Sequence, residues 1–490
     1  MSPETSNPPG TPQLRRNSLG LSELVFQGVT HIAPATNMVF TFPIIALKAG
    51  PVMPLSFLLA AVVCFFIGNT VSQFSRYMPS SGGYYAFATR GLGSRGGFMA
   101  TWSYLIYEIL GTAGCTGFLG YLVSDMWRMQ FQLNIPWWSF ALATSALIWA
   151  LTHHGIQLSA RITALLGGVE VLIMLALSIT FLMHPGPGST YAAPLEPTAS
   201  PQHYGGVLAG MVFAILALSG FEAPAPLAQE ARRPAKFISQ AITLSLVTIG
   251  AFYIFTSYAS AIGWGTGDMA AFAANANPYY VLGHALWGAG WWFVVLAIIN
   301  SVIGVGLACT NAASRVMYTM GRAGTLPARF GSIHARHRTP AMAIGFVQVS
   351  GMAAILLVGW LLKPEYIFGF LETIATLAVI LLYVMANLAL TRYMRREHLA
   401  QFAVWRHVVA PWLATLALLP VLFVTVYPSP PWPYNITPYL FLASLITGFA
   451  YMQVREERNP GTLRRGAILL LRGGGDAEGE LGCEEPVVPL

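Results

Sequence analysis

Long apolar segments separated by short polar stretches follow one another along the whole chain. A bilayer core about 30 Å thick is crossed by a helix of roughly 20 apolar residues. Reading the apolar runs in order predicts about twelve membrane-spanning helices. Their expected limits are 23–47, 52–75, 97–123, 138–153, 162–183, 204–228, 239–262, 286–313, 341–361, 367–391, 406–427 and 437–454.

The composition agrees with this pattern. Of the 490 residues, 55% are hydrophobic and only 9% are charged, whereas soluble proteins average about 25% charged residues. We therefore predict an all-α integral membrane protein. The four cysteines form no Cys-x-x-Cys pair, so the sequence gives no sign of a disulfide framework or a zinc site.

The basic residues are divided unevenly between alternate loops. If the N-terminus is cytoplasmic, only Lys48, Arg128 and Lys363 of the 26 lysines and arginines fall on the outer side. Basic loops are retained on the cytoplasmic side of membranes. We therefore predict a multi-pass protein of the plasma (inner) membrane with both termini in the cytoplasm. The net charge of +7 then reflects topology, and no nucleic-acid partner is expected.

Two of the predicted spans carry a concentrated interruption. Residues 31–37 of the first read His-Ile-Ala-Pro-Ala-Thr-Asn, and residues 219–224 of the sixth read Ser-Gly-Phe-Glu-Ala-Pro. A proline inside a helix removes a hydrogen-bond donor and clashes with the preceding turn. Interruptions at matching positions of two five-helix sets are typical of inverted-repeat transporters, which bind their substrate between the broken helices. Two simple proline kinks are the alternative.

Three stretches of the chain resemble the amino acid–polyamine–organocation transporters. The first is 76–85, Arg-Tyr-Met-Pro-Ser-Ser-Gly-Gly-Tyr-Tyr, followed by Gly97, Phe98 and Trp102; the second is 219–222 continuing through Glu-Ala-Arg-Arg-Pro at 230–234; the third is Ser-Arg-Val-Met-Tyr at 314–318, with 321–322, 326–327 and 338–340. The resemblance covers the first ten helices in order. It implies a LeuT-type fold, with two inverted five-helix repeats plus two C-terminal helices, and alternating-access transport of amino acids or amines.

The resemblance also divides the chain. The expected parts are a disordered cytoplasmic tail at 1–21, the first repeat at 22–183, an extracytoplasmic loop at 184–203, the second repeat at 204–391, helices 11 and 12 at 392–454, and a cytoplasmic tail at 455–490. One departure affects the substrate. Family members commonly carry a Gly-Ser-Gly type break in the first helix, where this chain has Ala33, Pro34 and Ala35. A decarboxylated amine therefore stays an alternative to an amino acid.

Four carboxyl groups fall within or near the predicted spans, with no lysine in mid-span to pair with them: Glu108, Glu170, Glu222 and Glu372. A charge at the bilayer centre costs roughly 2.5–3.5 kcal/mol on insertion scales, so each should face a cavity, hold a proton or meet a cation. By resemblance, Glu170 lies where proton-coupled members carry a lysine in place of a sodium ion. We therefore predict proton coupling through Glu170, with Glu222 as the second candidate. A carboxyl group with a purely structural role is the alternative, and Glu372 could instead lie near the outer interface.

The substrate site is expected around the two interruptions and on the third span. There, Tyr104 and Glu108 are four residues apart, which places an aromatic ring and a carboxylate on one helix face, suited to an ammonium group. In the family, the residue corresponding to Phe221 forms an aromatic lid over the substrate. Asn37, Asn300 and Ser301 are further polar candidates. The residues predicted to bind substrate are His31, Ile32, Ala33, Pro34, Ala35, Thr36, Tyr104, Glu108, Ser219, Gly220, Phe221 and Glu222.

Together these features predict a proton-coupled symporter, with small molecules, protons and lipid as its partners. An exchanger, a transporter-like sensor or a channel is the alternative. No enzyme motif is present: the pattern of Gly91, Gly93 and Gly96 lacks the preceding strand of a dinucleotide site. No cofactor is expected. Neither is a metal, because the histidine pairs at 153–154 and 334/337 have no carboxylate or thiolate companion at ligand spacing.

Overall fold

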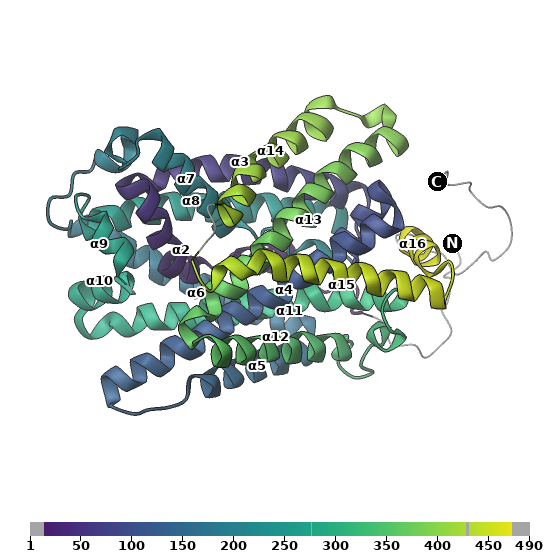
Figure 1. The fold of residues 1–490 in the computed structure, drawn as a ribbon, viewed down its shortest axis with the longest axis horizontal. Coiled ribbons are helices and arrows are strands. Elements are labelled where there is room, and N and C mark those ends of the chain that lie inside the picture. The colour runs from purple at the N-terminus through teal and green to yellow at the C-terminus, as the bar shows by residue number, and fades with distance from the viewer. Residues whose placement is uncertain (1–13, 276, 428–430, 473–490) are drawn as a thin grey trace.

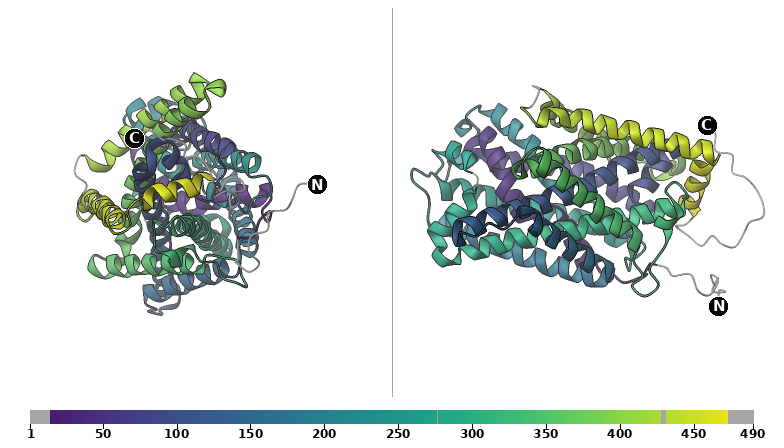
Figure 2. Two further views of the ribbon diagram at one scale, coloured as in Figure 1. Left: turned by 90° about the vertical axis from the view of Figure 1, so that its right-hand side faces the viewer. Right: turned by 60° about the horizontal axis from the view of Figure 1, so that its bottom comes forward.

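The computed structural model describes residues 14–275, 277–427 and 431–472. Within these ranges the chain forms a helical bundle without a β-sheet, and one isolated β-bridge joins Leu19 to Ala231. Most long helices run along the longest axis of the molecule (Figure 1), and Figure 2 shows the bundle end-on at the left. The residues at 1–13 and 473–490, which belong to the two predicted cytoplasmic tails, lie outside the described ranges.

Each of the twelve predicted spans contains helix, which confirms the all-α fold. The first half consists of α1 (Leu21–His31), α2 (Pro34–Ala49), α3 (Met53–Tyr77), α4 (Tyr84–Phe131), α5 (Trp137–His153) and α6 (Ile156–Met183). The later spans contain α7 (Tyr204–Leu218), α8 (Pro234–Trp264), α11 (Trp292–Arg322), α12 (Ala341–Leu361), α13 (Ile367–Glu397), α14 (Ala410–Val426) and α15 (Thr437–Arg458). Three short helices supplement them: α9 (Met269–Ala274), α10 (Pro278–Trp287) and α16 (Thr462–Arg472).

By length and composition, eight helical segments of the described chain can cross a membrane. One of them, Leu21–Tyr77, contains two of the predicted spans. Helices α5 and α7 have only 17 and 15 residues, and α15 is less apolar. Numerous leucine, valine and phenylalanine side chains on the outer helices stay exposed to the surroundings, as expected for helices that face lipid hydrocarbon.

The first interruption is short. Helix α1 ends at His31 and α2 begins at Pro34, so only two residues between them leave the helix. Ala33 adopts a left-handed conformation with φ 54°, which is uncommon for a residue with a side chain. Pro34 is the first residue of α2, where its missing N–H removes no helical hydrogen bond.

The second interruption is longer than the first, and no α-helix follows it until α8 begins at Pro234. Helix α7 ends at Leu218, and Gly220 follows with φ 114°, a conformation that favours glycine. The chain then makes turns and a single 3₁₀ segment, Ala225–Leu227, before α8. The predicted span 204–228 therefore does not resume as an α-helix. Pro224 and Pro226 explain this difference, because neither can donate the backbone hydrogen bond that a continuing helix needs.

Parts of both predicted tails are ordered. The backbone N–H groups of Ser18 and Leu19 donate to the carbonyl oxygen of Glu230, at 2.8 and 3.0 Å, and Arg232 donates back to Leu19. At the other terminus, α15 continues to Arg458 and α16 follows it, packing against α4. The end of the bundle that carries α16, at the right of Figure 1, is called the α16 end below.

Candidate functional site

The two interruptions lie against each other. A Cβ atom placed on Gly220 would lie 2.7 Å from Cδ2 of His31 and 3.1 Å from its carbonyl carbon. These distances are too short for a side chain, so the absence of one at Gly220 allows this approach. The hydrophobic segments that contain the breaks are about 190 residues apart in the chain, yet their broken ends share one location, as an inverted-repeat carrier requires.

One side chain connects the backbones of both interruptions. Nδ2 of Asn37 donates hydrogen bonds to the carbonyl oxygens of Ile32, at the end of α1, and Ala217, at the end of α7. Its Oδ1 accepts a hydrogen bond of 2.7 Å from the hydroxyl of Thr41. Nearby, the N–H group of Thr36 donates to Oγ of Ser301 at 3.2 Å. Backbone groups released by the breaks thus have polar partners inside the bundle, where water and lipid cannot supply them reliably.

A cavity of about 320 Å³ lies beside the interruptions. It extends away from the α16 end, past Ile44 and Phe368, to Tyr434 in the connection before α15. Of the predicted substrate-binding residues, those that line it are His31, Ile32, Ala33, Thr36 and Ser219. The predicted residues that do not line it are Pro34, Ala35, Tyr104, Glu108, Gly220, Phe221 and Glu222.

The acidic side chain that lines the cavity is Glu372, on α13. The sequence analysis named it as one of four membrane carboxyl groups, with a position near the outer interface as an alternative, and it was not among the predicted site residues. It shares a polar stripe with Gly369, Thr373 and Thr376, all of which line the cavity. The spacing i, i+3, i+4 and i+7 places these residues on one helix face. This polar face is the feature of the sequence that could have indicated a site at Glu372. Sγ of Cys115, another lining residue, lies 3.8 Å from Oε1 of Glu372.

Glu108 lies next to the cavity without lining it. Its Oε2 is 3.6 Å from Nε2 of His31, and the same imidazole nitrogen is 3.4 Å from Sγ of Cys309. Glu108 is fully buried, and within the described chain neither of its oxygens has a hydrogen-bond partner. The hydroxyl of Tyr104 on the same helix has none either. Two nearby residues that line the cavity, Tyr107 and Cys309, were not among the predicted substrate-binding residues.

Glu222 is engaged within its own turn. Its Oε2 accepts a hydrogen bond of 3.1 Å from the N–H of Gly220, and its Oε1 accepts one of 2.8 Å from the hydroxyl of Tyr383 on α13. The ring of Phe221 stacks on Tyr383, with the centroids 6.0 Å apart. Glu222 and Phe221 thus both contact Tyr383 and hold the second interruption against α13. The aromatic rings that line the cavity belong to Tyr107, Phe213, Phe368 and Tyr434.

Glu170 occupies a separate position on α6. It is fully buried, and among the described residues its carboxyl oxygens have no hydrogen-bond partner. One turn earlier on the same helix, a Cβ on Gly167 would lie 2.5 Å from Cγ2 of Thr30, so this face of α6 packs closely on α1. Helix α11 also packs on α6. Glu170 therefore lies where a change in the position of α1 would alter its surroundings.

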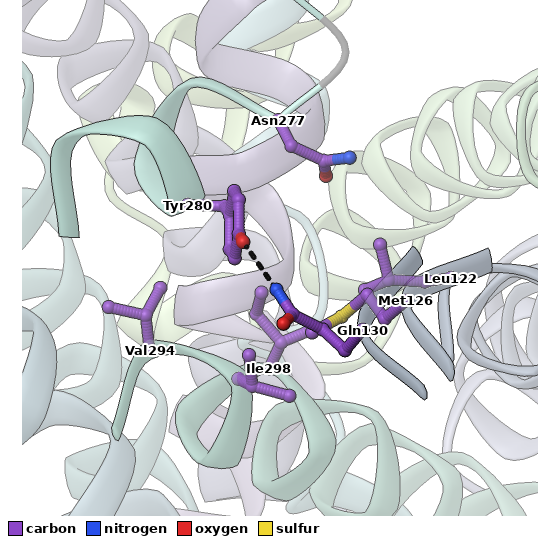
Figure 3. Close-up of a pocket in the computed structure, with 8 residues that line it drawn as sticks. Leu122, Met126, Gln130, Asn277, Tyr280, Val294 and Ile298 are labelled. Carbon is purple, nitrogen blue, oxygen red and sulfur yellow. Dashed lines mark hydrogen bonds between the residues drawn. The ribbon is translucent and has the colours of Figure 1, made fainter. Parts of the chain in front are cut away.

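A second, smaller pocket lies between α4, α10 and α11. Its volume is about 20 Å³, which accommodates little more than one water molecule. Nε2 of Gln130 donates to the hydroxyl of Tyr280 across it, at 3.0 Å (Figure 3). The pocket is too small for an amino acid, so the larger cavity is the candidate substrate site.

A bundle of membrane-length helices, in which two interrupted segments meet beside an internal cavity, defines a membrane transporter. The amino acid permease family matches residues 24–458 of the chain. The chain belongs to this family, within the amino acid–polyamine–organocation superfamily. It is accordingly a permease and not an enzyme.

Several characterised permeases are similar to this chain. The branched-chain amino acid permease BcaP of Bacillus subtilis is 27% identical over 356 residues, covering 69% of this chain and 74% of the relative. The low-affinity putrescine importer PlaP of Escherichia coli is 26% identical over 348 residues, covering 69% and 75%. The L-asparagine permease of Salmonella typhimurium is 24% identical over 428 residues, covering 81% of each chain. The names of these relatives describe permeases or importers of amino acids or of an amine.

Proposed function

We propose that this permease is a secondary active transporter that imports an amino acid or a related amine together with protons. The observation that supports this most directly is the contact between the two interrupted segments, joined by Asn37 beside a cavity of about 320 Å³. A cavity of this size suits a small organic substrate. The names of the relatives include a branched-chain amino acid permease and a putrescine importer, and an ammonium group is common to these substrates.

The proposed ammonium position lies between helix ends and an acidic side chain. Helices α1 and α7 end at the interruptions, and a helix C-terminus carries partial negative charge. Glu372 adds a carboxylate to the cavity wall. The N-terminus of α2 begins at Pro34 and carries partial positive charge, which favours a substrate carboxylate. An amino acid would use both the ammonium position, at the ends of α1 and α7, and the carboxylate position, at the start of α2. A decarboxylated amine would use the ammonium position alone.

Glu170 is proposed to carry the coupling proton, with Glu222 as the second candidate. The oxygens of Glu222 already accept two hydrogen bonds that support the break. Glu170 has no such partner among the described residues, and one turn away on the same helix Gly167 packs against Thr30 of α1. Burying an isolated charged carboxylate is costly, so an unpartnered carboxyl group gains most from binding a proton. Proton release when α1 moves would link the proton to the conformational change.

The alternating-access step is proposed to open the α16 end. There, Glu230 and Arg315 form a buried ion pair, while the cavity extends in the opposite direction. The concentration of basic residues in the loops on the α16 side supports a cytoplasmic location for that end. The described conformation would then be closed to the cytoplasm, with the cavity directed toward the exterior.

Transport by purified protein in proteoliposomes tests this proposal. Uptake of a panel containing branched-chain amino acids, asparagine and putrescine would be measured with an acidic exterior, and again after the pH gradient is collapsed. Saturable accumulation that requires the gradient is expected for at least one of them. Uptake only against preloaded substrate would identify an exchanger, and unsaturable flux a channel. Binding without flux would identify a sensor, and each of these three results would refute proton-coupled import.

A further inference from the structure

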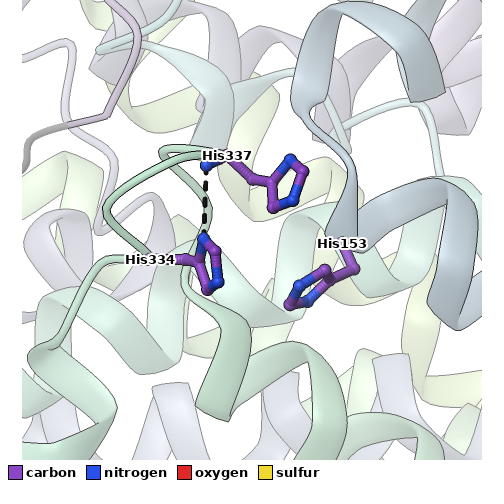
Figure 4. A group of neighbouring side chains, drawn as sticks. All are labelled: His153, His334 and His337. Atoms are coloured by element: carbon purple, nitrogen blue, oxygen red, sulfur yellow. Dashed lines mark hydrogen bonds between the residues drawn. The ribbon is translucent and has the colours of Figure 1, made fainter.

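Histidines from two distant parts of the chain meet near the α16 end of the bundle. His153 is the last residue of α5, whereas His334 and His337 lie in the connection between α11 and α12. One ring nitrogen from each lies within 4.8 Å of the other two. Figure 4 shows the three rings around a shared space. We call these three residues the His153 cluster. It lies outside the cavity and has no part in the proposed transport steps.

The backbone around the cluster is held in place by hydrogen bonds. The hydroxyl of Thr339 donates to the carbonyl oxygen of His153 at 3.0 Å. The N–H of His334 donates to the carbonyl oxygen of Thr339 at 2.9 Å. His334 and His337 are placed on one side of a single turn, which is closed by a 2.9 Å bond from the N–H of Arg338 to the carbonyl of His334. The three rings are therefore brought together by an ordered junction between α5 and this connection.

The ring nitrogens are available for a ligand. Nδ1 of His153 is buried and has no hydrogen-bond partner within the described chain. Nδ1 of His334 has only a long contact of 3.3 Å from the N–H of His337. The positive charge of Arg336 opposes a cation, but its side chain is exposed and screened by solvent.

We propose that the His153 cluster is a binding site for a divalent transition-metal ion of the zinc class, which ties the end of α5 to the connection between α11 and α12. Three imidazoles with a water molecule in the fourth position form a known zinc coordination. Zinc–nitrogen bonds of about 2.0–2.1 Å place tetrahedral ligands about 3.4 Å apart. Small side-chain rotations would bring the three nitrogens from their present separation to that distance. Mg²⁺, which prefers oxygen ligands, should not bind.

Zinc binding to the full-length protein tests the site. The protein would be purified without a histidine tag and freed of metal with a chelator, and then titrated with Zn²⁺ by calorimetry and by competition with a fluorescent chelator. Binding at the cluster and a rise in unfolding temperature on zinc addition are expected. His334→Ala and His337→Ala should each weaken this binding by at least about tenfold, the scale of effect seen when a metal environment is altered.

Two control variants make the result specific. His184→Ala removes an exposed histidine at the end of α6, outside the cluster, and should leave zinc binding unchanged. Cys309→Ser alters the other group of potential ligands, formed by His31, Glu108 and Cys309, and should also leave it unchanged. Wild-type affinity in both cluster variants, or loss of binding in Cys309→Ser alone, would overturn the proposal. Metal-free unfolding temperatures equal to that of the wild type establish that the cluster variants are folded.

Discussion

Arg315 and Glu230 form an ion pair from which solvent is excluded. Nε of Arg315 lies 3.0 Å from Oε2 of Glu230, and the side chains are 0% and 1% exposed. A second bond of 3.3 Å joins Nη2 to Oε1, so the pairing is bidentate. The backbone carbonyl of Glu230 also accepts hydrogen bonds from Ser18 and Leu19. The pair thus joins α11, the connection before α8, and the segment before α1 at the end of the bundle where the cavity is closed.

Removing one partner of this pair should be costly. Glu230→Gln leaves the Arg315 charge buried without its counter-charge, and single removals of this kind cost about 3–5 kcal/mol. A large fall in unfolding temperature in detergent is therefore expected. The double variant Glu230→Leu with Arg315→Met should lose less stability than Glu230→Gln, because it buries no unpaired charge. Equal losses in the two proteins would show that the charge pairing itself is not what stabilises this end.

A side chain at Gly220 should disrupt the contact between the interruptions. Gly220→Ala combines a φ of 114° with a Cβ only 2.7 Å from the ring of His31, and strained backbone of this kind costs on the order of 1–3 kcal/mol. Loss of transport and of thermal stability is expected. Gly168→Ala on α6 is the matched control, because its Cβ would meet no atom within 4 Å. Normal transport by Gly220→Ala would contradict the close packing of the two breaks.

Neutralising Glu372 should weaken the binding of amines. In Glu372→Gln the cavity loses its lining carboxylate, and hydrogen bonds to charged groups contribute about 1.5–3 kcal/mol. A rise in KM of roughly tenfold or more is expected for a cationic amine such as putrescine, with a smaller rise for a neutral amino acid. Glu365→Gln, outside the cavity lining, serves as the control. An unchanged KM for every transported substrate would exclude Glu372 from substrate binding.

Replacing Glu170 should uncouple transport from the pH gradient. Glu170→Gln keeps the size of the side chain, but an amide cannot bind and release a proton at the pH values of a transport assay. Substrate binding and downhill exchange are expected to persist, while accumulation driven by an acidic exterior is lost. The measurement is uptake in proteoliposomes with and without the gradient, with Glu222→Gln alongside. Persistent gradient-driven accumulation in Glu170→Gln would assign the proton to another group, and its selective loss in Glu222→Gln would point to Glu222.

The sequence by itself determined the all-α membrane fold and the location of both interruptions. These features are local. Apolar length decides which segments cross a bilayer. Pro34 begins α2, and Gly220 and Pro224 lie in the second interruption, each through its own backbone chemistry. The similarity of the stretches around Glu230 and Arg315 to one transporter family was also visible in the sequence. It did not show that these two side chains are partners.

Only the tertiary structure decided which polar side chains share a space. Glu372 lines the cavity while Glu108 lies beside it and Glu222 supports a turn, because helix packing determines which face of each helix points inward. The carbonyl oxygen of His153 and the hydroxyl of Thr339 are 186 positions apart in sequence but in contact, and the histidines around them meet for the same reason. Contacts at that separation depend on how complete helices pack, which the local pattern of residues does not specify.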